Sequence, residues 1–144
     1  MPAYDPNNIF AKILRGDIPS IKVYEDSDTV VIMDIMPQAD GHVLVLPRAP
    51  SRNILDADPQ TFKPLFETVQ VMARAVQKAF GAQGVLIKQF NEEAAGQTVF
   101  HLHIHVVPRK EGVDLRPHGG KMADMTLLAR HAEMIKQALN APQT

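Results

Sequence analysis

Three histidines alternate with apolar residues over positions 101–107, in the order His-Leu-His-Ile-His-Val-Val. Side chains in a β-strand have a period of two, so this pattern predicts a strand with the imidazoles on one face and the apolar side chains on the other. Imidazoles rooted about 7 Å apart along a strand are costly to bury on a face that is merely structural. The segment therefore predicts a sheet with one face in the core and a chemically active opposite face.

The spacing of apolar residues and the positions of capping and turn residues predict the other elements. Residues 8–15 form a short capped helix, a long helix begins at Asp58 and Pro59 and ends at Gly81, and a final helix begins at about Asp124. Short runs of β-branched residues between turn residues predict strands. The expected strands are 21–25, 29–34, 42–46, 85–90 and 100–107, the last ended by Pro108, and the expected buried stripe of the long helix is Phe62, Leu65, Phe66, Val69, Met72, Ala73, Val76 and Phe80.

These elements predict an α+β fold: a sheet of about five strands, mostly antiparallel, with one long helix packed on it and a C-terminal helix. The 144 residues suit a single domain, with a core over about residues 8–110 and a C-terminal loop and helix over about 111–144. The chain is 45% hydrophobic and 22% charged, which is ordinary for a globular protein. It can therefore bury a core without covalent staples.

Charge and cysteine content exclude several classes of function. With 15 Lys and Arg against 16 Asp and Glu, the formal net charge is −1, so the chain lacks a broad basic field for a nucleic-acid backbone. It has no cysteine, which excludes disulfides, zinc ribbons and thiol nucleophiles. The polar opening residues and short apolar runs predict a cytoplasmic protein without a targeting segment or a membrane span.

The row of imidazoles allows two kinds of chemistry. A His-x-His pair on a strand can bind zinc, but the nearby Glu92 and Glu93 lack the spacing of a metal motif. Alternatively, a neutral imidazole can attack phosphorus while a second one binds or protonates the phosphate near pH 7. The preceding residues 94–98 favour phosphate, because Gly96 lets backbone N–H groups approach an anion and Thr98 offers a hydroxyl.

Residues 101–107 match the histidine triad motif, His-φ-His-φ-His-φ-φ with φ apolar, at every position. Further segments between about residues 8 and 109 resemble the same family in the same order. They are Ile9-Phe10-x-Lys12-Ile13, Arg15-Gly16-Asp17-Ile18-Pro19, Val23-Tyr24-Glu25-Asp26, Asp34-Ile35-x-Pro37-Gln38, Gly41-His42-x-Leu44-Val45-x-Pro47, Asn91 and Gly96-Gln97-Thr98-Val99. The chain is identified as a member of the histidine triad family, of the nucleotide hydrolase and phosphoramidase type.

The resemblance implies cleavage at the α-phosphate of a purine nucleotide by a homodimer, whose interface uses the long helix and a strand edge. His103 would attack phosphorus and form a covalent nucleotidyl-imidazole, and His105 would bind the α-phosphate. The carbonyl of His101 would position the nucleophile, and His42 would fix the tautomers. This scheme demands no metal or cofactor. The expected substrates are nucleoside 5′-phosphoramidates or related conjugates; the alternatives are dinucleoside polyphosphates, or a nucleotide-binding interaction protein with incidental catalysis.

The resemblance also assigns binding residues, each with a structural alternative. The expected phosphate ligands are Asn91, Gly96, Gln97 and Thr98, and the expected nucleoside-binding residues are Asp34, Ile35, Ile9, Phe10, Ile13 and Ile32. The carboxylate of Asp34 can accept two ribose hydroxyls or form a turn, and Asn91 can also serve as a turn residue. The apolar residues can equally be plain core.

Two departures from the family pattern bear on metal and leaving group. Relatives with a structural zinc use cysteines near the opening helix, where this chain has Asn8 and Ala11, and a histidine where it has Pro50; no structural zinc is expected. Pro108-Arg109 follows the triad, as in dinucleotide hydrolases and many bacterial members, where phosphoramidases often have a glycine pair. The C-terminal residues that can contact a polyphosphate, or belong to a solvated loop, are Arg116, His118 and Lys121.

Overall fold

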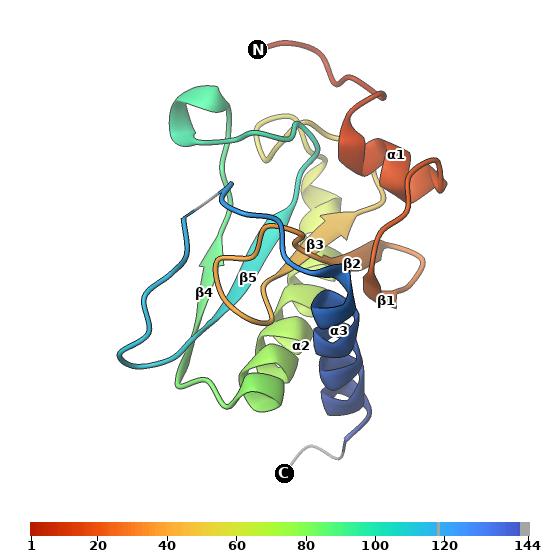
Figure 1. Ribbon diagram of the computed structural model, residues 1–144. Coiled ribbons are helices and arrows are strands. Elements are labelled where there is room, and N and C mark those ends of the chain that lie inside the picture. Colours follow the sequence, from red (N-terminus) through yellow and green to blue (C-terminus); the bar gives the residue numbers. More distant parts are fainter. Residues whose placement is uncertain (118, 142–144) are drawn as a thin grey trace.

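The computed structural model describes residues 1–117 and 119–141. The elements are α1 (Ile9–Arg15), β1 (Lys22–Glu25), β2 (Thr29–Met33), β3 (Val43–Pro47), the 3-10 turn η1 (Pro59–Thr61), α2 (Phe62–Phe80), β4 (Gly84–Lys88), the 3-10 turn η2 (Glu93–Ala95), β5 (Ile104–Arg109) and α3 (Met125–Asn140). The strands form one antiparallel sheet in the order β1-β2-β3-β5-β4 (Figure 1). The predicted α+β fold, with its long helix and its C-terminal helix, is confirmed.

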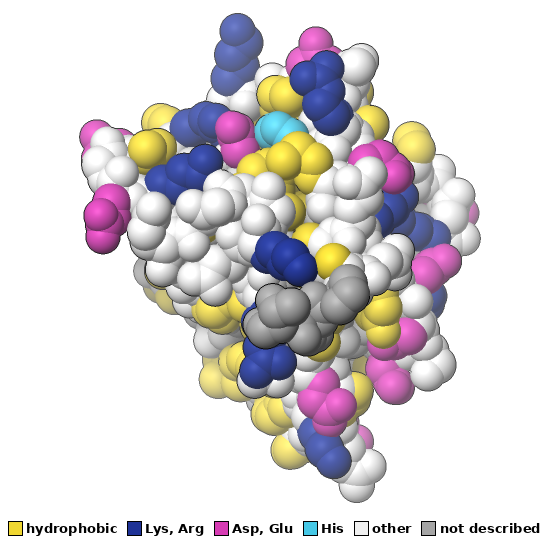
Figure 2. Space-filling model, turned by 90° about the horizontal axis from the view of Figure 1, so that it is seen from below, with side chains coloured by type: hydrophobic (Ala, Val, Ile, Leu, Met, Phe, Trp, Pro, Cys, Tyr) yellow, Lys and Arg dark blue, Asp and Glu magenta, His cyan; other side chains and the backbone are white. Residues whose placement is uncertain are grey.

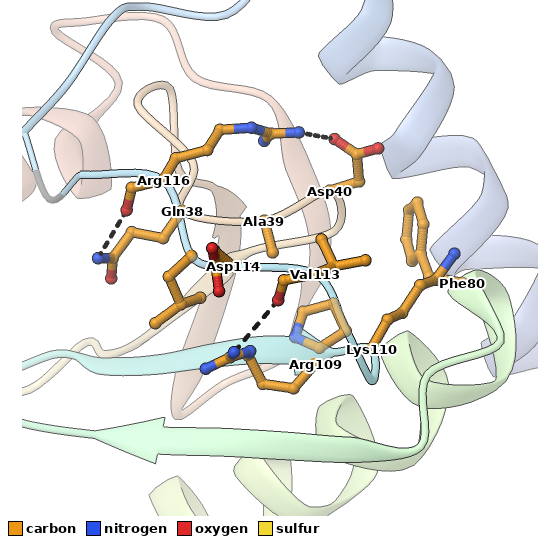
Figure 3. A pocket seen from close by; sticks show the side chains of 11 residues that line it. Gln38, Ala39, Asp40, Phe80, Arg109, Lys110, Val113, Asp114 and Arg116 are labelled. Carbon is orange, nitrogen blue, oxygen red and sulfur yellow. Dashed lines mark hydrogen bonds and ion pairs between the residues drawn. The ribbon is translucent and has the colours of Figure 1, made fainter.

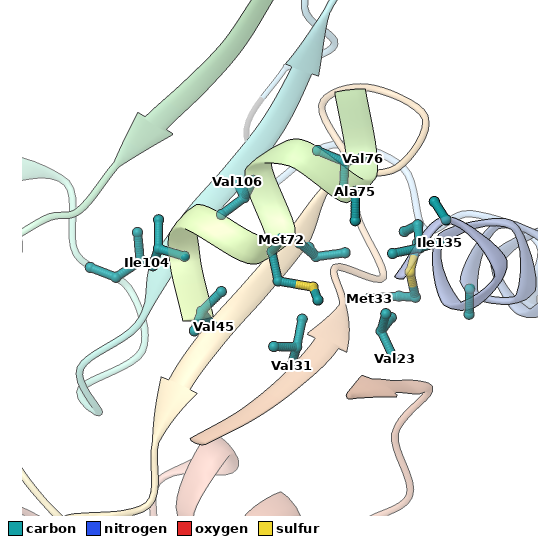
Figure 4. Close-up of a cluster of buried hydrophobic side chains, with 14 of the residues drawn as sticks. Val23, Val31, Met33, Val45, Met72, Ala75, Val76, Ile104, Val106 and Ile135 are labelled. Carbon is teal, nitrogen blue, oxygen red and sulfur yellow. The ribbon is translucent and has the colours of Figure 1, made fainter. Parts of the chain in front are cut away.

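Helices cover both faces of the sheet, so β2 and β3 are buried along their whole length. Alternate side chains pack with α2 and α3 on one face and with α1 on the other. Figure 4 shows the larger cluster, in which Met72 and Val76 of α2 lie over the valines of the sheet and Ile135 of α3 joins them. The smaller cluster consists of Phe10, Ile13, Val30, Ile32, Leu44 and Leu46.

The strand register places His105 on the face that carries α1. Leu44 of β3 lies opposite His105 of β5, and opposite residues of an antiparallel pair share a face. The neighbours of His105, Ile104 and Val106, belong to the larger cluster under α2. The predicted division of this segment into an apolar core side and an imidazole side therefore holds for the part that forms a strand.

Capping residues close to each helix end determine where the helices begin and end. The side chain of Asn8 accepts a hydrogen bond from the backbone N–H of Ala11, and Gly16 ends α1. Asp58 caps the turn η1 through the N–H of Gln60, so the long helix begins with a 3-10 turn before its regular part. Gly81 ends α2 in the left-handed conformation.

The prediction that Phe66 belongs to the buried stripe of α2 is wrong. Its side chain is 45% exposed, whereas Leu65, Met72 and Val76 are fully buried. Successive residues of an α-helix are 100° apart, so Phe66 points well away from the line through Leu65, Met72 and Val76. The stripe is narrower than predicted, and an aromatic side chain is left on the surface.

The triad strand begins later than predicted. β5 starts at Ile104, whereas the predicted strand started at residue 100. Before the strand, the N–H of Leu102 donates to the carbonyl of Ser51 at 2.9 Å. The first two triad histidines therefore lie before the strand, in a segment that this hydrogen bond ties to the loop after β3.

The prediction that Pro108 ends this strand is wrong. β5 continues through Pro108 to Arg109 and pairs there with β4. β3 pairs with β5 only at positions 104–106, so Pro108 lies beyond that ladder. A proline is tolerated where its missing N–H faces an unpaired side of a strand.

The surface carries both signs of charge. In the view of Figure 2, basic and acidic side chains are interspersed and neither forms a large field of its own. This agrees with the near-zero net charge. Among the described residues, no helix is both long and apolar enough to cross a bilayer.

Candidate active site

A cavity of about 460 Å³ lies between α1, the sheet and the end of the loop before the triad. Its wall is mostly apolar, with a few polar groups in the region of the histidines. Among the residues that line it are all six expected nucleoside-binding residues, one expected phosphate ligand and two triad histidines: Asp34, Ile35, Ile9, Phe10, Ile13, Ile32, Thr98, His103 and His105. A largely apolar cavity with a few convergent polar groups is the usual form of a small-molecule site.

The ring of His103 is oriented by the backbone just before it. Its Nδ1 lies 2.6 Å from the carbonyl oxygen of His101, which can only accept, so Nδ1 carries the proton and donates. A neutral imidazole has one N–H, and the Nε2 of His103 therefore holds the lone pair. The ring of Phe10 meets His103 edge to face, with centroids 4.7 Å apart. His103 thus has the tautomer of a nucleophile, against the apolar wall of the cavity.

His42 and His105 form a chain with a defined direction. The backbone N–H of Gln38 donates to Nδ1 of His42 at 3.0 Å, so a neutral His42 carries its proton on Nε2. That Nε2 lies 3.0 Å from Nδ1 of His105 and 3.4 Å from Oδ2 of Asp34. His105 accepts at Nδ1 and carries its own proton on Nε2. The ring centroids of His103 and His105 are 5.1 Å apart, so the lone pair and the N–H donor belong to neighbouring rings.

His101 lies behind the cavity and is fully buried. Its Nε2 donates to the carbonyl of Pro47 at 2.9 Å, and its Nδ1 accepts from the hydroxyl of Tyr4 at 2.7 Å. Burial lowers the pKa of His101, which keeps the ring neutral. Sequence reasoning missed Tyr4, because it is 97 residues away from His101 in a polar segment without any recognisable pattern.

Three of the expected phosphate ligands shape the loop between β4 and the triad. The buried Gln97 accepts from Asn53 and from the N–H of Glu92, and donates to two backbone carbonyls. The side chain of Asn91 accepts from the N–H of Ile54 at 3.0 Å. Among the expected phosphate ligands, Thr98 lines the cavity, whereas Asn91, Gly96 and Gln97 are absent from its described lining.

An ion pair ties this loop to the one after β3. Arg52 contacts Glu92 at 2.7 Å, and its guanidinium lies 4.0 Å from the ring centroid of Phe100. The hydrogen bonds from Arg52 lower the pKa of the Glu92 carboxyl. Glu92, which had been weighed as a metal ligand, therefore serves to hold the two loops together.

One group within the described residues has its potential metal-ligating atoms within 4.8 Å of one another: Asp34, His42 and His105. Its proton arrangement does not suit a metal ion. Because Nδ1 of His42 accepts from Gln38, a metal at Nε2 would require the imidazole to lose its remaining proton. The three residues therefore fit a chain of hydrogen bonds with fixed proton positions better than a metal centre. That the reaction needs no metal stays a prediction.

Gln38, which no sequence argument assigned to the site, joins the imidazoles to the loop after β5. Its backbone carbonyl accepts from the N–H of Arg116 at 2.8 Å, and its side chain donates to the carbonyl of Arg116 at 3.2 Å. Figure 3 shows these residues around a second cavity of about 260 Å³, where the guanidinium of Arg116 pairs with Asp40 at 2.7 Å. Lys121 is exposed. His118 lies outside the described residues, and a polyphosphate role for this loop stays a prediction.

Comparisons with known proteins agree with this geometry. The HIT domain model matches residues 15–112. The chain is 42% identical over 103 residues to the protein named Protein hit of Bacillus subtilis, which covers 72% of this chain and 71% of that protein. It is 36% identical over 103 residues to adenylylsulfatase HINT3 of Arabidopsis thaliana, covering 72% of this chain and 52% of the plant protein.

A solved structure extends the likeness over nearly the whole chain. A Hit-like protein involved in cell-cycle regulation from Bartonella henselae superimposes with a TM-score of 0.89 and 51% identity, covering 94% of this chain and 99% of that one. The triad geometry, the matching domain model and these relatives lead to one conclusion: the chain belongs to the HIT domain family, as a histidine triad protein of the nucleotide-binding type.

Proposed function

We propose that this protein hydrolyses purine nucleotide conjugates at the α-phosphate through a covalent nucleotidyl group on His103. The observation that carries the proposal is the hydrogen bond from Nδ1 of His103 to the carbonyl of His101. It leaves the lone pair on Nε2, beside the N–H of His105, in a cavity of a size that suits a small-molecule ligand.

The reaction takes two displacements. The Nε2–P bond to His103 forms while the bond to the leaving group breaks, and the leaving group takes up a proton from solvent. Water then attacks phosphorus, the Nε2–P bond breaks and returns its electron pair to Nε2, the proton lost by the water passes to solvent, and a nucleoside monophosphate is released. Two steps replace one difficult step, and the N–H of His105 can stabilise charge on the phosphoryl oxygens in both.

The lining of the cavity supports a division of labour between its ends. Ile9, Phe10 and Ile13 of α1, with Ile32 and Ile35 from the sheet side, would hold the base against apolar walls. Asp34 would bind the ribose hydroxyls through the carboxylate that lies near His42; its Oδ1 also accepts from the N–H of Met36, so the turn function is present too. Thr98, backed by the loop of Asn91, Gly96 and Gln97, would contact the phosphate.

The leaving group is the open part of this proposal. The first choice is a nucleoside 5′-phosphoramidate, which loses an amine. The plant relative is named an adenylylsulfatase, and this favours adenosine 5′-phosphosulfate, in which sulfate leaves, as a second conjugate of the same class. Dinucleoside polyphosphates, and nucleotide binding with incidental turnover, are the competing functions. We expect the protein to act in the cytoplasm as a homodimer.

The decisive experiment incubates wild type and His103→Ala with adenosine 5′-phosphoramidate in the presence of a chelator and follows AMP release. Turnover by the wild type, and a fall of at least a thousandfold in a variant that still binds AMP, supports covalent catalysis by His103. As a matched control, His131→Gln changes a histidine of α3 outside the cavity and should keep its turnover.

The same experiment separates the alternatives. Parallel incubations with adenosine 5′-phosphosulfate and diadenosine polyphosphates identify the preferred leaving group. Tight AMP binding with negligible turnover of every substrate would contradict the proposal and favour the binding-protein function. Activity that the chelator abolishes and Zn²⁺ restores would favour a metal-dependent reaction instead.

A further inference from the structure

Lys88 ends β4 directly beside the triad. In the register of β4 and β5 it lies opposite His105, so the two side chains share the face on which the cavity lies. Lys88 is only partly exposed, although it is a lysine on an edge strand. Lysines are rarely buried unless their ammonium group has partners, so the groups that Nζ of Lys88 contacts indicate its role.

The ammonium group of Lys88 has two neighbours that lead to the imidazoles. Nζ donates to the side-chain oxygen of Gln38, the residue whose backbone N–H donates to Nδ1 of His42. Nζ also lies 5.8 Å from the ring centroid of Phe90, and that ring meets His105 edge to face at 5.6 Å. Lys88 is therefore linked to both ends of the His42–His105 chain without lining the cavity itself.

The charges around the imidazoles are few. Among the residues that line the cavity, the titratable groups are Asp34, His103 and His105, and α1 contributes only apolar residues to the wall. His42 and the neutral His101 lie behind them. The carboxylate of Asp34 favours protonated imidazoles, and the ammonium of Lys88 opposes it. Asp34 and Lys88 act on each other as well: burial lowers the pKa of Lys88, while the charge of Asp34 raises it.

We propose that Lys88 is a positioning residue of this site: its ammonium group holds Gln38 in place, so that His42 and His105 keep their tautomers, and its charge offsets Asp34, so that the imidazoles remain neutral near pH 7. The inference rests on the proposed function, because a protonated His103 cannot attack phosphorus. The effect belongs to the charge and the hydrogen bond of Lys88 rather than to its packing.

The test compares Lys88→Met with Lys88→Arg by measuring kcat/KM for adenosine 5′-phosphoramidate from pH 5 to pH 9. Removing a positive charge makes protonation of the imidazoles easier and raises their pKa values. The acidic limb of the Lys88→Met profile should therefore move up by about one pH unit, with about tenfold lower activity on that limb and recovery at high pH. Lys88→Arg should restore the wild-type profile, and Lys136→Met, which removes a charge from α3, should not change it.

A second measurement needs no turnover. NMR titration of the ring signals of His103 and His105 reports their pKa values and tautomers directly. If the wild type does not turn over the substrate but Lys88→Met still shifts the imidazole pKa values, the role of Lys88 stands and only the proposed reaction is contradicted. Unchanged imidazole pKa values, or an equal loss of activity at every pH, would overturn the role of Lys88. Lys88→Gln, which keeps a hydrogen-bond donor, provides the same titration if Lys88→Met does not fold, and should shift the pKa values while keeping the tautomers.

Discussion

Backbone groups determine which nitrogen of each central histidine carries the proton. The carbonyl of His101 can only accept, and the N–H of Gln38 can only donate, so they set opposite tautomers in His103 and His42. The path of the chain places both backbone groups, and in the proposal above the contact from Lys88 helps to hold Gln38 there. The candidate nucleophile His103 and the candidate hydrogen-bond donor to the phosphate, His105, therefore have the required tautomers before any ligand binds, as preorganised catalysis requires.

Tyr4 extends this control to the residue behind the nucleophile. In Tyr4→Phe, Nδ1 of the buried His101 loses its donor, and we expect the free energy of unfolding to fall by about 1–2 kcal/mol. Urea denaturation measures the change. Tyr24→Phe is the matched control, because that hydroxyl bonds Asp26 at an exposed position and should change stability by less than about 0.5 kcal/mol. Equal effects of the two substitutions would contradict the role given to Tyr4.

At the scale of elements, the loop between β4 and β5 is built around inward-facing polar side chains. The amide of Gln97 bonds four partners, and the pair Arg52–Glu92 ties the loop to the one after β3. Gly96 allows the turn, because its φ of 102° lies in a region that side chains disfavour. In the proposed site, this internal network would hold the loop so that Thr98 and backbone groups face the phosphate.

Gly96→Ala tests that arrangement. The substitution strains the left-handed backbone by about 1–2 kcal/mol, and the added Cβ would lie 3.4 Å from the ring of Phe90, which itself contacts His105. We expect AMP to bind about tenfold more weakly by calorimetry. In Gly84→Ala the new Cβ meets no atom within 4 Å, so affinity should remain at the wild-type level. Unchanged AMP affinity in Gly96→Ala would show that the loop does not hold the phosphate.

At the scale of the whole molecule, β4 lies at one edge of the sheet, and α2 exposes an aromatic side chain. In the described chain β4 is the last strand of the sheet, and its Ile87 is 40% exposed. Phe66 is 45% exposed on α2. Open strand edges favour pairing with another chain, and exposed apolar side chains favour burial, so these features support the proposed homodimer.

Sedimentation equilibrium should therefore give a mass about twice that of the 15.9 kDa chain. Burial of a phenylalanine contributes about 1.5–3 kcal/mol, so Phe66→Asp should weaken the dimer by at least tenfold. Met122→Asp changes an exposed side chain in the C-terminal loop, and the dimer should persist in it. A wild type that remains monomeric at micromolar concentration would contradict the homodimer.

The spacing of apolar residues and the positions of capping and turn residues are sufficient to predict the helices, the strands and the antiparallel order of the first three strands. These features depend on contacts between near neighbours in the chain. The nucleoside-binding residues were assigned by the family resemblance instead; the structure brings all six together along one cavity, and their role in binding stays a prediction. Prediction from local patterns failed at Phe66, at the start of β5 and at Pro108, where contacts with distant segments decide burial and pairing.

The local order of residues thus determined the elements and the alternation that separates imidazoles from core. Tertiary structure alone decided which nitrogen of each imidazole carries the proton. It also decided that Tyr4 bonds His101, that Gln38 bonds His42 and that Lys88 bonds Gln38. The physical reason is that a hydrogen bond acts over about 3 Å, and groups far apart in sequence reach that distance only when the sheet register and the loops have brought them together.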